Sequence, residues 1–236
     1  KGIQSTTIDT TFERDTSLEQ AVERVRRDAR QAIDDGYEVL CLSDRAAGAD
    51  RIPIPSLLTV GAVHHDLIRS GQRTHAALVL ESGQPCAVHH FCTLLGFGAD
   101  AVHPYLAYAS VRDLAVRSDE VADLETAIKR YIGAVEQGLL KVMAKMGIST
   151  LESYKGAQVF EAVGLDSAFV EEYFFGTTSR IEGAGIKEIE ADLRERHRKA
   201  FDVTLPRATD LDTGGELYWR RDGEHHQWNP QTIGKL

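Results

Sequence analysis

The sequence is poor in cysteine, with only Cys41, Cys86 and Cys92 among its 236 residues. An odd number of cysteines scattered through apolar segments predicts reduced, buried thiols rather than a disulfide framework. Five residues separate Cys86 from Cys92, a spacing that some iron–sulfur sites use. Such a cluster needs about three or four ligands, however, and no further cysteine is near. We therefore expect all three to be core cysteines.

Long apolar runs and basic clusters are also missing. No stretch reaches the roughly 18 apolar residues that span a bilayer, and the first residues lack the apolar core of a signal peptide. Lys and Arg number 27 against 36 Asp and Glu, and they form no cluster with interleaved aromatic residues. We therefore expect neither nucleic acid nor a membrane as a partner, and a cytoplasmic location. Because the chain opens on Lys1 rather than on methionine, we expect a piece of a longer protein.

Common signatures of catalytic and phosphate-binding sites are absent. The chain has neither G-x-G-x-x-G after a strand nor G-x-x-x-x-G-K-[ST], no G-x-S-x-G and no H-E-x-x-H. Histidine occurs in three doublets, at 64–65, 89–90 and 225–226. Adjacent side chains diverge on a helix or strand, so each doublet is expected to hold one packed and one surface histidine rather than a metal. These patterns disfavour a nucleoside triphosphate site, a hydrolase and a metal centre.

What is present in the first hundred residues is a repeated cycle of helix, glycine, apolar strand and polar turn. The pattern predicts helices over residues 17–35, 56–70 and 86–97, and strands over residues 37–42, 75–80 and 101–103. This cycle is typical of parallel strands joined by helical crossovers. The predicted fold class is α/β with a parallel sheet.

Polar residues follow each predicted strand, at residues 43–45, 81–83 and 103–105. Ligands of parallel sheets bind beyond the carboxyl ends of the strands, so these three turns are candidate sites by position. The pair Asp44 and Arg45 could be a ligand clamp or an ion pair that ties a loop to the neighbouring unit. The structural role is favoured because ion pairs are commoner than functional sites.

The second half of the chain predicts a further helix over residues 119–137, and helices over residues 167–174 and 185–201. We place a domain boundary near residues 110–120. Asp222-Gly223, between two segments with aromatic residues, predicts a small β-hairpin.

The most distinctive segment covers residues 138–162, GLLKVMAKMGISTLESYKGAQVFEA. Residues 142–144 are apolar and strand-like, with Lys141 and Lys145 on either side, and a turn of small and hydroxyl residues follows. Backbone amides in such a turn can contact a polar ring edge or a phosphate. On composition alone, a buried strand and turn with surface lysines is the preferred interpretation.

This segment closely resembles the opening of the flavin domain of the glutamate synthase family. Ala144 stands where serine is expected, and Lys155 where arginine is expected. Other blocks agree in order along the chain, including IDTTF at 8–12, LSDR at 42–45, IPSLL at 54–58, GAVHH at 61–65, PYLA at 104–107 and GTTSRI at 176–181. His103 departs from the expected asparagine. The resemblance covers essentially the whole chain.

The resemblance implies that residues 1–115 are the C-terminal part of the central domain. Residues 116–236 would then be the N-terminal part of an FMN-binding (β/α) barrel-type domain with a small hairpin excursion. It implies FMN as cofactor, with the iron–sulfur ligands outside this segment. On the motif, the residues expected beside the flavin or its substrate are Lys145, Met146, Gly147, Ile148, Ser149, Lys155 and Gln158. A lysine near the flavin N1–C2 edge stabilises the reduced anion, and an amide such as Gln158 can bond the pyrimidine ring.

The resemblance also implies the reaction and its partners. Glutamine-derived ammonia would be added to 2-oxoglutarate, with electrons from an NAD(P)H-dependent small subunit or from ferredoxin. The location would be the cytoplasm, or the plastid stroma in a photosynthetic eukaryote. The rest of the large subunit would supply the missing parts, so the segment alone is expected to be inactive. Two alternatives stay open, a non-catalytic scaffold or ammonia-channel module and a complete small flavoprotein.

Overall fold

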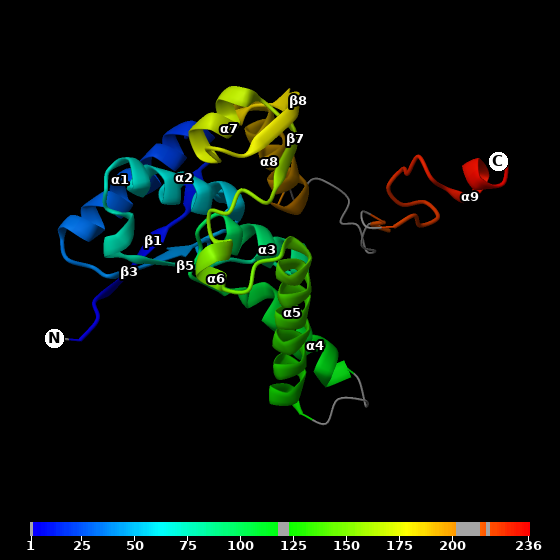
Figure 1. Cartoon of the computed structure of the whole chain (residues 1–236), viewed down its shortest axis with the longest axis horizontal. Helices are drawn as coiled ribbons and strands as arrows, with labels where there is room; N and C mark the ends of the chain where they lie inside the picture. The colour runs from blue at the N-terminus through cyan, green and yellow to red at the C-terminus, as the bar shows by residue number, and fades with distance from the viewer. Residues whose placement is uncertain (1, 118–122, 202–212, 216–217) are drawn as a thin grey trace. The chain divides into compact units, whose positions relative to one another are not determined.

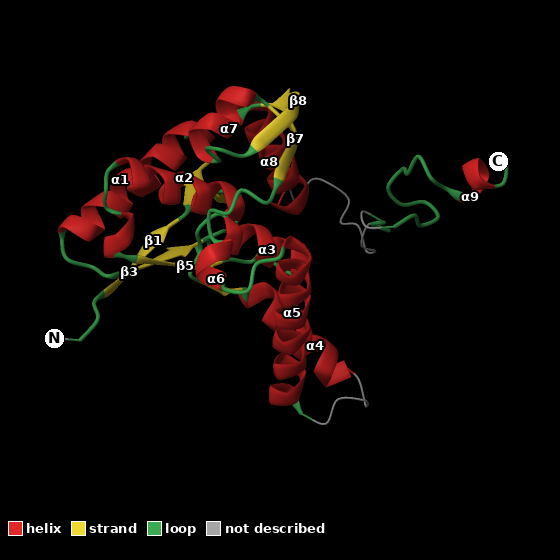
Figure 2. Ribbon diagram, in the orientation of Figure 1, coloured by secondary structure: helices red, strands yellow, loops and turns green. Residues whose placement is uncertain are grey.

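The computed structural model describes residues 2–117, 123–201, 213–215 and 218–236. Contacts divide the chain into two compact units, Lys1–Arg198 and Lys199–Leu236. Among the described residues, the first unit holds all the strands and most of the helices (Figures 1 and 2). Its elements are β1 (Ser5–Asp9), β2 (Thr11–Glu13), α1 (Leu18–Asp34), β3 (Val39–Ser43), β4 (Arg51–Pro53), α2 (Ser56–Arg69), η1 (Arg73–His75), β5 (Ala77–Glu81), α3 (Val88–Gly96), β6 (Ala101–His103), α4 (Tyr105–Arg117), α5 (Leu124–Met146), α6 (Leu151–Tyr154), β7 (Glu161–Leu165), α7 (Ser167–Tyr173), β8 (Thr178–Ala184) and α8 (Ile186–Phe201).

A four-stranded parallel sheet in the order β1-β3-β5-β6 forms the centre of this unit. Each crossover moves one strand further in the same direction. Since such crossovers are right-handed, their helices are expected on one face of the sheet. The contacts agree, because α1 packs against α2 and α2 against α3. The predicted α/β class, its parallel sheet and the three helix–strand cycles are confirmed.

The two faces of the sheet differ in burial. Leu40, Leu42, Leu78 and Leu80 alternate along β3 and β5 toward the helices and are at most 1% exposed. Their neighbours on the opposite face, such as Cys41 and Val79, are only half-buried. The hydrophobic core therefore lies between the sheet and the helices α1 to α3. Parallel sheets usually have both faces covered, and the described residues leave the second face of this one partly open.

The later elements β7, α7, β8 and α8 pack onto this core. The buried Arg26 of α1 donates to Glu172 of α7 at 2.6 Å (Nη1 to Oε1). Arg194 of α8 donates to the carbonyl oxygen of Arg14 at 2.7 Å, and Glu190 of α8 accepts from the backbone amide of Leu18 at 2.9 Å. The strands β7 and β8 pair in parallel, as a separate two-stranded sheet. The start of a barrel beyond this pair stays a prediction.

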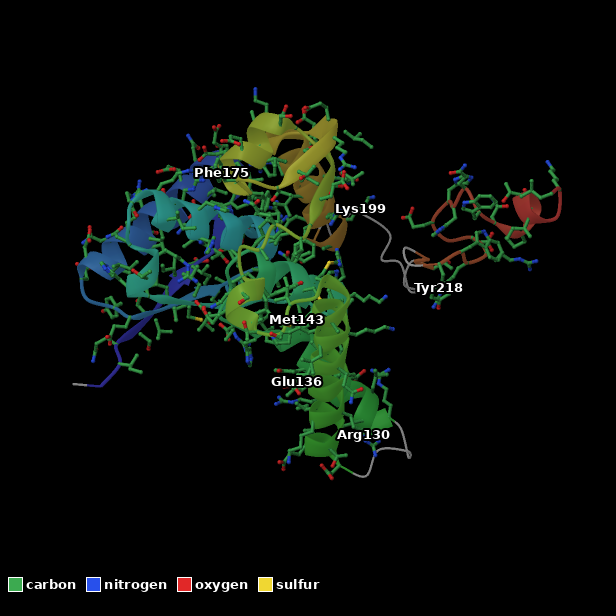
Figure 3. The ribbon with its side chains drawn as sticks, viewed as in Figure 1. Arg130, Glu136, Met143, Phe175, Lys199 and Tyr218 are labelled. Carbon is green, nitrogen blue, oxygen red and sulfur yellow. The ribbon has the colours of Figure 1, made fainter. Side chains whose placement is uncertain are left out.

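Helices α4 and α5 pack side by side beyond the sheet (Figure 1). Asp123 caps α5 by accepting from the Thr126 amide at 2.8 Å, and Gly147 ends it with a φ of 73°, the left-handed conformation that glycine adopts easily. Arg130, Glu136 and Met143 mark the length of α5 in Figure 3. No helix among the described residues is both long and apolar enough to cross a membrane.

In the second unit, the described residues form a turn rather than a hairpin. Asp222 adopts a positive φ of 61°, and the Glu224 amide donates to the Gly214 carbonyl oxygen at 2.8 Å. Within 213–215 and 218–236 the only regular element is α9 (Pro230–Ile233), and residues 216 and 217 of the predicted hairpin lie outside the described part. The predicted turn is present, and the described residues on either side of it, 218–220 and 225–228, form no strand. The domain boundary expected near residue 115 stays a prediction.

Gly61 allows the close approach of α2 to the end of α7. A Cβ at this position would lie 2.6 Å from Cε1 of Phe174 and 2.7 Å from the carbonyl oxygen of Tyr173. We expect Gly61→Ala to lower the free energy of unfolding by about 1–3 kcal/mol, because the backbone oxygen cannot move aside without shifting α7. Chemical denaturation measures the change.

Gly133→Ala provides the matched control for Gly61→Ala. Gly133 also lies inside a helix, but a Cβ there would meet nothing within 4 Å. Alanine should stabilise this position by about 0.5–1 kcal/mol through helix propensity. Equal effects of the two substitutions would contradict the tight contact between α2 and α7.

Candidate functional site

The distinctive segment begins as a helix, not as a strand. The predicted strand at residues 142–144 is wrong, since these residues form the last turns of α5, which continues to Met146. Leu139, Val142 and Met143 recur at helical spacing, and Val142 is the one β-branched residue between 138 and 146. Strong helix formers surround it, so the short apolar run belongs to the preceding helix. The predicted helix over residues 119–137 was therefore too short.

The segment from 150 to 160 is hydrogen-bonded to the second half of α3. Thr150 caps the short helix α6, and the hydroxyl of the fully buried Tyr154 donates to the carbonyl oxygen of Cys92 at 3.2 Å. The Gly156 amide donates to the Gly96 carbonyl oxygen at 2.9 Å. The last two bonds attach the middle of the segment to α3.

Lys155 takes part in this attachment through Asp100. Its Nζ donates to Asp100 Oδ1 at 2.6 Å, while Asp100 Oδ2 accepts from Arg73 Nη2 at 2.9 Å and from the Leu78 amide at 2.8 Å. Burial alone would raise the pKa of Asp100, but the bonds from Lys155, Leu78 and Arg73 outweigh it and lower that pKa. Burial opposes the charge of Lys155 as well, yet Asp100 and Glu152 raise its pKa. The positive charge of Lys155 is therefore paired with the carboxylate of Asp100.

Gln158 lies in an unusual backbone conformation beside a glycine. Its φ of 54° is uncommon for a residue other than glycine. The side-chain amide of Gln158 packs against Gly176, since a Cβ added to Gly176 would lie 2.1 Å from Gln158 Nε2. Gln158 contributes to the lining of a pocket of about 190 Å³. Such local strain is often found at binding sites, which makes this pocket a candidate.

The structure separates the seven residues that the motif assigns to the flavin. Lys145, Met146, Gly147 and Ser149 are exposed around the end of α5, and Ile148 is half-buried there. None of these five lines the pocket, Lys155 is engaged by Asp100, and Gln158 alone reaches the pocket wall. The assignment of these residues to a flavin stays a prediction.

The three strand-end turns meet at one edge of the sheet, as their positions predicted. Asp44 is 3% exposed and accepts hydrogen bonds from Ser82 Oγ at 2.5 Å, from the Gly83 amide at 3.1 Å and from the Tyr105 hydroxyl at 2.7 Å. Burial, together with the Asp44 carboxyl group, raises the pKa of Tyr105. A single side chain thus joins the ends of three strands.

Arg45 lies at the exposed side of the same sheet edge and pairs with Glu81. Its Nε donates to Glu81 Oε1 at 2.7 Å, its guanidinium lies 4.3 Å from the centre of the Tyr105 ring, and Glu81 also accepts from Ser43 Oγ at 2.6 Å. The structural interpretation of Asp44 and Arg45 is confirmed, since both tie loops to neighbouring units. Asp44 bonds Ser82, Gly83 and Tyr105, and Arg45 bonds Glu81, which makes the edge a structural junction.

Histidines and cysteines depart from the expectations. His64 and His65 are both half-buried and both line the pocket, whereas His89 and His90 are both exposed, so the expected division into packed and surface histidine is wrong for these two doublets. Cys86 is exposed rather than buried, Cys41 is half-buried and Cys92 is buried. The described residues bring together no group of three or more side chains suited to a metal. Sequence reasoning missed the pocket because its walls come from distant segments.

Comparison with known proteins gives a consistent result. Residues 1–166 match the family model of the glutamate synthase central domain. The glutamate synthase [NADPH] large chain of Bacillus subtilis (strain 168) is 41% identical over 234 residues, 99% of this chain and 15% of that protein. The glutamate synthase [NADH] of Schizosaccharomyces pombe is 43% identical over 219 residues, 92% of this chain and 10% of that protein.

A relative that is named for a different electron donor matches this chain over a similar length. The ferredoxin-dependent glutamate synthase 2 of Synechocystis is 40% identical over 251 residues, 99% of this chain and 16% of that protein. The chain therefore spans less than a fifth of the length of each of these relatives. With the family model covering more than half of its residues, this chain belongs to the glutamate synthase family.

Proposed function

We propose that this chain is part of the large subunit of a glutamate synthase, which makes glutamate from glutamine and 2-oxoglutarate. The match to the central-domain model over residues 1–166 carries the proposal. In the domain arrangement that we propose, residues 1–115 end the central domain and residues 116–236 begin the FMN-binding domain. The whole enzyme acts in the cytoplasm, or in the plastid stroma of a photosynthetic eukaryote.

In the proposed reaction, ammonia released from glutamine adds to 2-oxoglutarate, and bound FMN supplies the hydride for the reduction that gives glutamate. Electrons come from an NAD(P)H-dependent small subunit or from ferredoxin, since relatives named for both kinds of donor match this chain. The iron–sulfur ligands lie in the remainder of the large subunit. Ammonia, 2-oxoglutarate and that remainder are the proposed partners.

The described residues do not by themselves fit a flavin. The pocket beside Gln158 measures about 190 Å³, below the roughly 300 Å³ at which ligand pockets for larger molecules begin. Five of the seven motif residues lie away from it. No step of the reaction is therefore assigned to this chain, and we propose that the longer protein supplies most of the flavin site. The isolated chain is accordingly proposed to be inactive.

Variants of the longer protein test the motif residues that carry free polar groups. We expect Gln158→Ala to reduce the bound flavin and Lys145→Ala to reduce glutamate formation, because each removes a hydrogen-bond donor proposed for the flavin edge. Gln137→Ala and Lys187→Ala make the same chemical changes at exposed positions and should change neither quantity. Unchanged flavin content and turnover in the first two variants would remove both residues from the site.

The rival candidate is a scaffold or ammonia-channel module without a cofactor of its own. The strand-end junction favours it, because Asp44 accepts from Ser82 and Tyr105 while Arg45 donates to Glu81. The absorbance of the purified 236-residue chain separates this rival from a complete small flavoprotein. We expect a folded, colourless protein, and a yellow one with bound flavin would favour the complete flavoprotein.

A further inference from the structure

The backbone around Gln158 has a conformation that its neighbours must hold in place. The φ of Gln158 is 54° and that of Gly156 is 71°, both in the left-handed region. For a residue other than glycine this conformation costs free energy, and it persists only where surrounding contacts over-determine it. The contacts on either side of Gln158 therefore decide where its side-chain amide lies.

On the C-terminal side of Gln158, Phe160 packs against the end of α3. Its ring stacks on that of Phe97 with centres 5.7 Å apart, and a Cβ added to Gly96 would lie 2.5 Å from Phe160 Cε2. The carbonyl oxygen of Gly96 also accepts from the Gly156 amide at 2.9 Å. Gly96 therefore contacts the chain on both sides of Gln158.

On the N-terminal side, the shortest polar contact is the ion pair between Lys155 and Asp100. Nζ lies 2.6 Å from Oδ1, and the two side chains are only 16% and 25% exposed. Glu152 is a second partner of Lys155 at 3.1 Å, but its side chain is 86% exposed, and exposed ion pairs contribute little. Asp100 is therefore the main partner that keeps Lys155 in place.

Asp100 is itself held rigidly by the central sheet. Its Oδ2 accepts from the Leu78 amide of β5 at 2.8 Å and from Arg73 Nη2 at 2.9 Å. Arg73 is fixed in turn, because its guanidinium also donates to the carbonyl oxygens of Ala76 and Gly98 at 2.8 and 2.9 Å. A carboxylate bonded to a central strand and its neighbouring loops is a firm point of attachment for another segment.

These contacts disagree with the place beside the flavin that the motif predicts for Lys155. A lysine that stabilises a reduced flavin needs its ammonium group at the N1–C2 edge of the ring. The Lys155 ammonium instead lies with two carboxylates, those of Asp100 and Glu152. Moving it to a flavin would remove one cation from the partly buried Asp100, which costs free energy. The structure therefore gives Lys155 a different place from the one that the motif predicts.

From this geometry we propose that Asp100 and Lys155 are positioning residues, whose ion pair holds residues 154–158 on the sheet and so sets the place of the Gln158 side-chain amide. Lys155 does not itself contact the flavin. The inference rests on the proposed function in its last step only, where Gln158 contacts the flavin. The attachment of residues 154–158 needs no bound flavin.

Hydrogen exchange of the longer protein tests the attachment. The amides of residues 154–157 all donate hydrogen bonds within the segment or to α3, so mass spectrometry of peptides that cover them measures how often it opens. We expect Lys155→Met and Asp100→Asn each to speed this exchange about tenfold, while the amides of β3 exchange as before. Both variants should fold, because Arg73 still pairs with Asp100 in the first and Lys155 with Glu152 in the second.

Four further variants separate the ion pair from a general effect of substitution. Lys155→Arg keeps the charge and a similar reach, and should restore the exchange rate to within about threefold of the unsubstituted protein. Glu152→Gln removes only the exposed partner, while Lys187→Met and Asp50→Asn repeat the test substitutions at exposed positions. These last three should change the exchange of residues 154–157 by less than about twofold.

The affinity of the longer protein for FMN separates positioning from direct contact. Lys155→Met and Asp100→Asn should weaken FMN binding by a similar factor, about three- to tenfold, and Lys155→Arg should restore it. Because Lys155 acts through Gln158, Lys155→Met should add little further loss in a protein that already carries Gln158→Ala. A lysine in contact with the flavin would add its own loss there, and Asp100→Asn would free it rather than reproduce that loss.

The proposal is overturned if Lys155→Met and Asp100→Asn leave the exchange of residues 154–157 unchanged. It is equally overturned if the losses of FMN affinity from Lys155→Met and Gln158→Ala add in full. A longer protein that binds no FMN contradicts the proposed function instead, and the exchange rates still decide whether Asp100 and Lys155 hold the segment.

Discussion

Replacement of Asp44 by alanine is expected to destabilise the first unit by about 3–5 kcal/mol, because it leaves three hydrogen-bond donors without their acceptor. The carboxyl group is 3% exposed and is the shared acceptor for Ser82, Gly83 and Tyr105. Without it, three donors at the ends of three strands lose their partner, and Ser82 is itself only 1% exposed. Each unsatisfied buried donor costs about 1–3 kcal/mol, partly relieved where water enters.

The measurement is the free energy of unfolding from urea denaturation followed by circular dichroism. Asp50→Ala is the control, since Asp50 is an exposed aspartate in the loop that follows the same strand. It should change stability by less than about 0.5 kcal/mol. A loss below about 1 kcal/mol for Asp44→Ala would contradict the structural junction and would return Asp44 to the list of candidate ligand-binding residues.

The second large effect concerns neighbouring residues on the central strand β5. Leu78 is fully buried against the helices, and we expect Leu78→Ala to cost about 2–5 kcal/mol by leaving a cavity. Val79 points to the opposite, half-buried face, and Val79→Ala should cost less than about 1 kcal/mol in this chain. The contrast follows because, in the part of the chain that the structure describes, helices pack on one face of the sheet.

Thermal or chemical denaturation of both variants checks this contrast. Equal losses would mean that the second face is also covered within the chain. In the longer protein, we expect the cost of Val79→Ala to rise, because parallel sheets usually carry packed layers on both faces. The difference between the two contexts measures how much of that face the rest of the protein covers.

The sequence predicted the parts of the fold that depend on local periodicity. Residues 17–35 have apolar positions at helical spacing, Ser17 and Gln20 form a capping box, and α1 follows closely. The short apolar run before Ser43 became a central strand for the same reason. From parallel connectivity alone, the polar turns at 43–45, 81–83 and 103–105 were expected at one edge, and Asp44 joins them there.

The features that were predicted wrongly or not at all share one cause, which is that they depend on residues distant in the sequence. Residues 142–144 were too few to distinguish a strand from a helix end, and the decisive signal was the cap at Asp123, nineteen or more residues earlier in the chain. The pocket depends on tertiary contacts between residues such as His64, Phe160 and Phe175, which lie far apart in sequence. The engagement of Lys155 by Asp100 likewise joins two distant segments. A motif predicted which residues are special, but not what surrounds them.

The central claim is that this chain is part of a glutamate synthase and acts only within the longer protein. The most direct measurement is glutamate formation from glutamine and 2-oxoglutarate, with reduced pyridine nucleotide or reduced ferredoxin as donor, by the longer protein and by the 236-residue chain in parallel. We predict glutamate formation by the longer protein and none by the chain alone. A longer protein that forms no glutamate with either donor would contradict the proposed function, and an active 236-residue chain would contradict its dependence on the rest of the subunit.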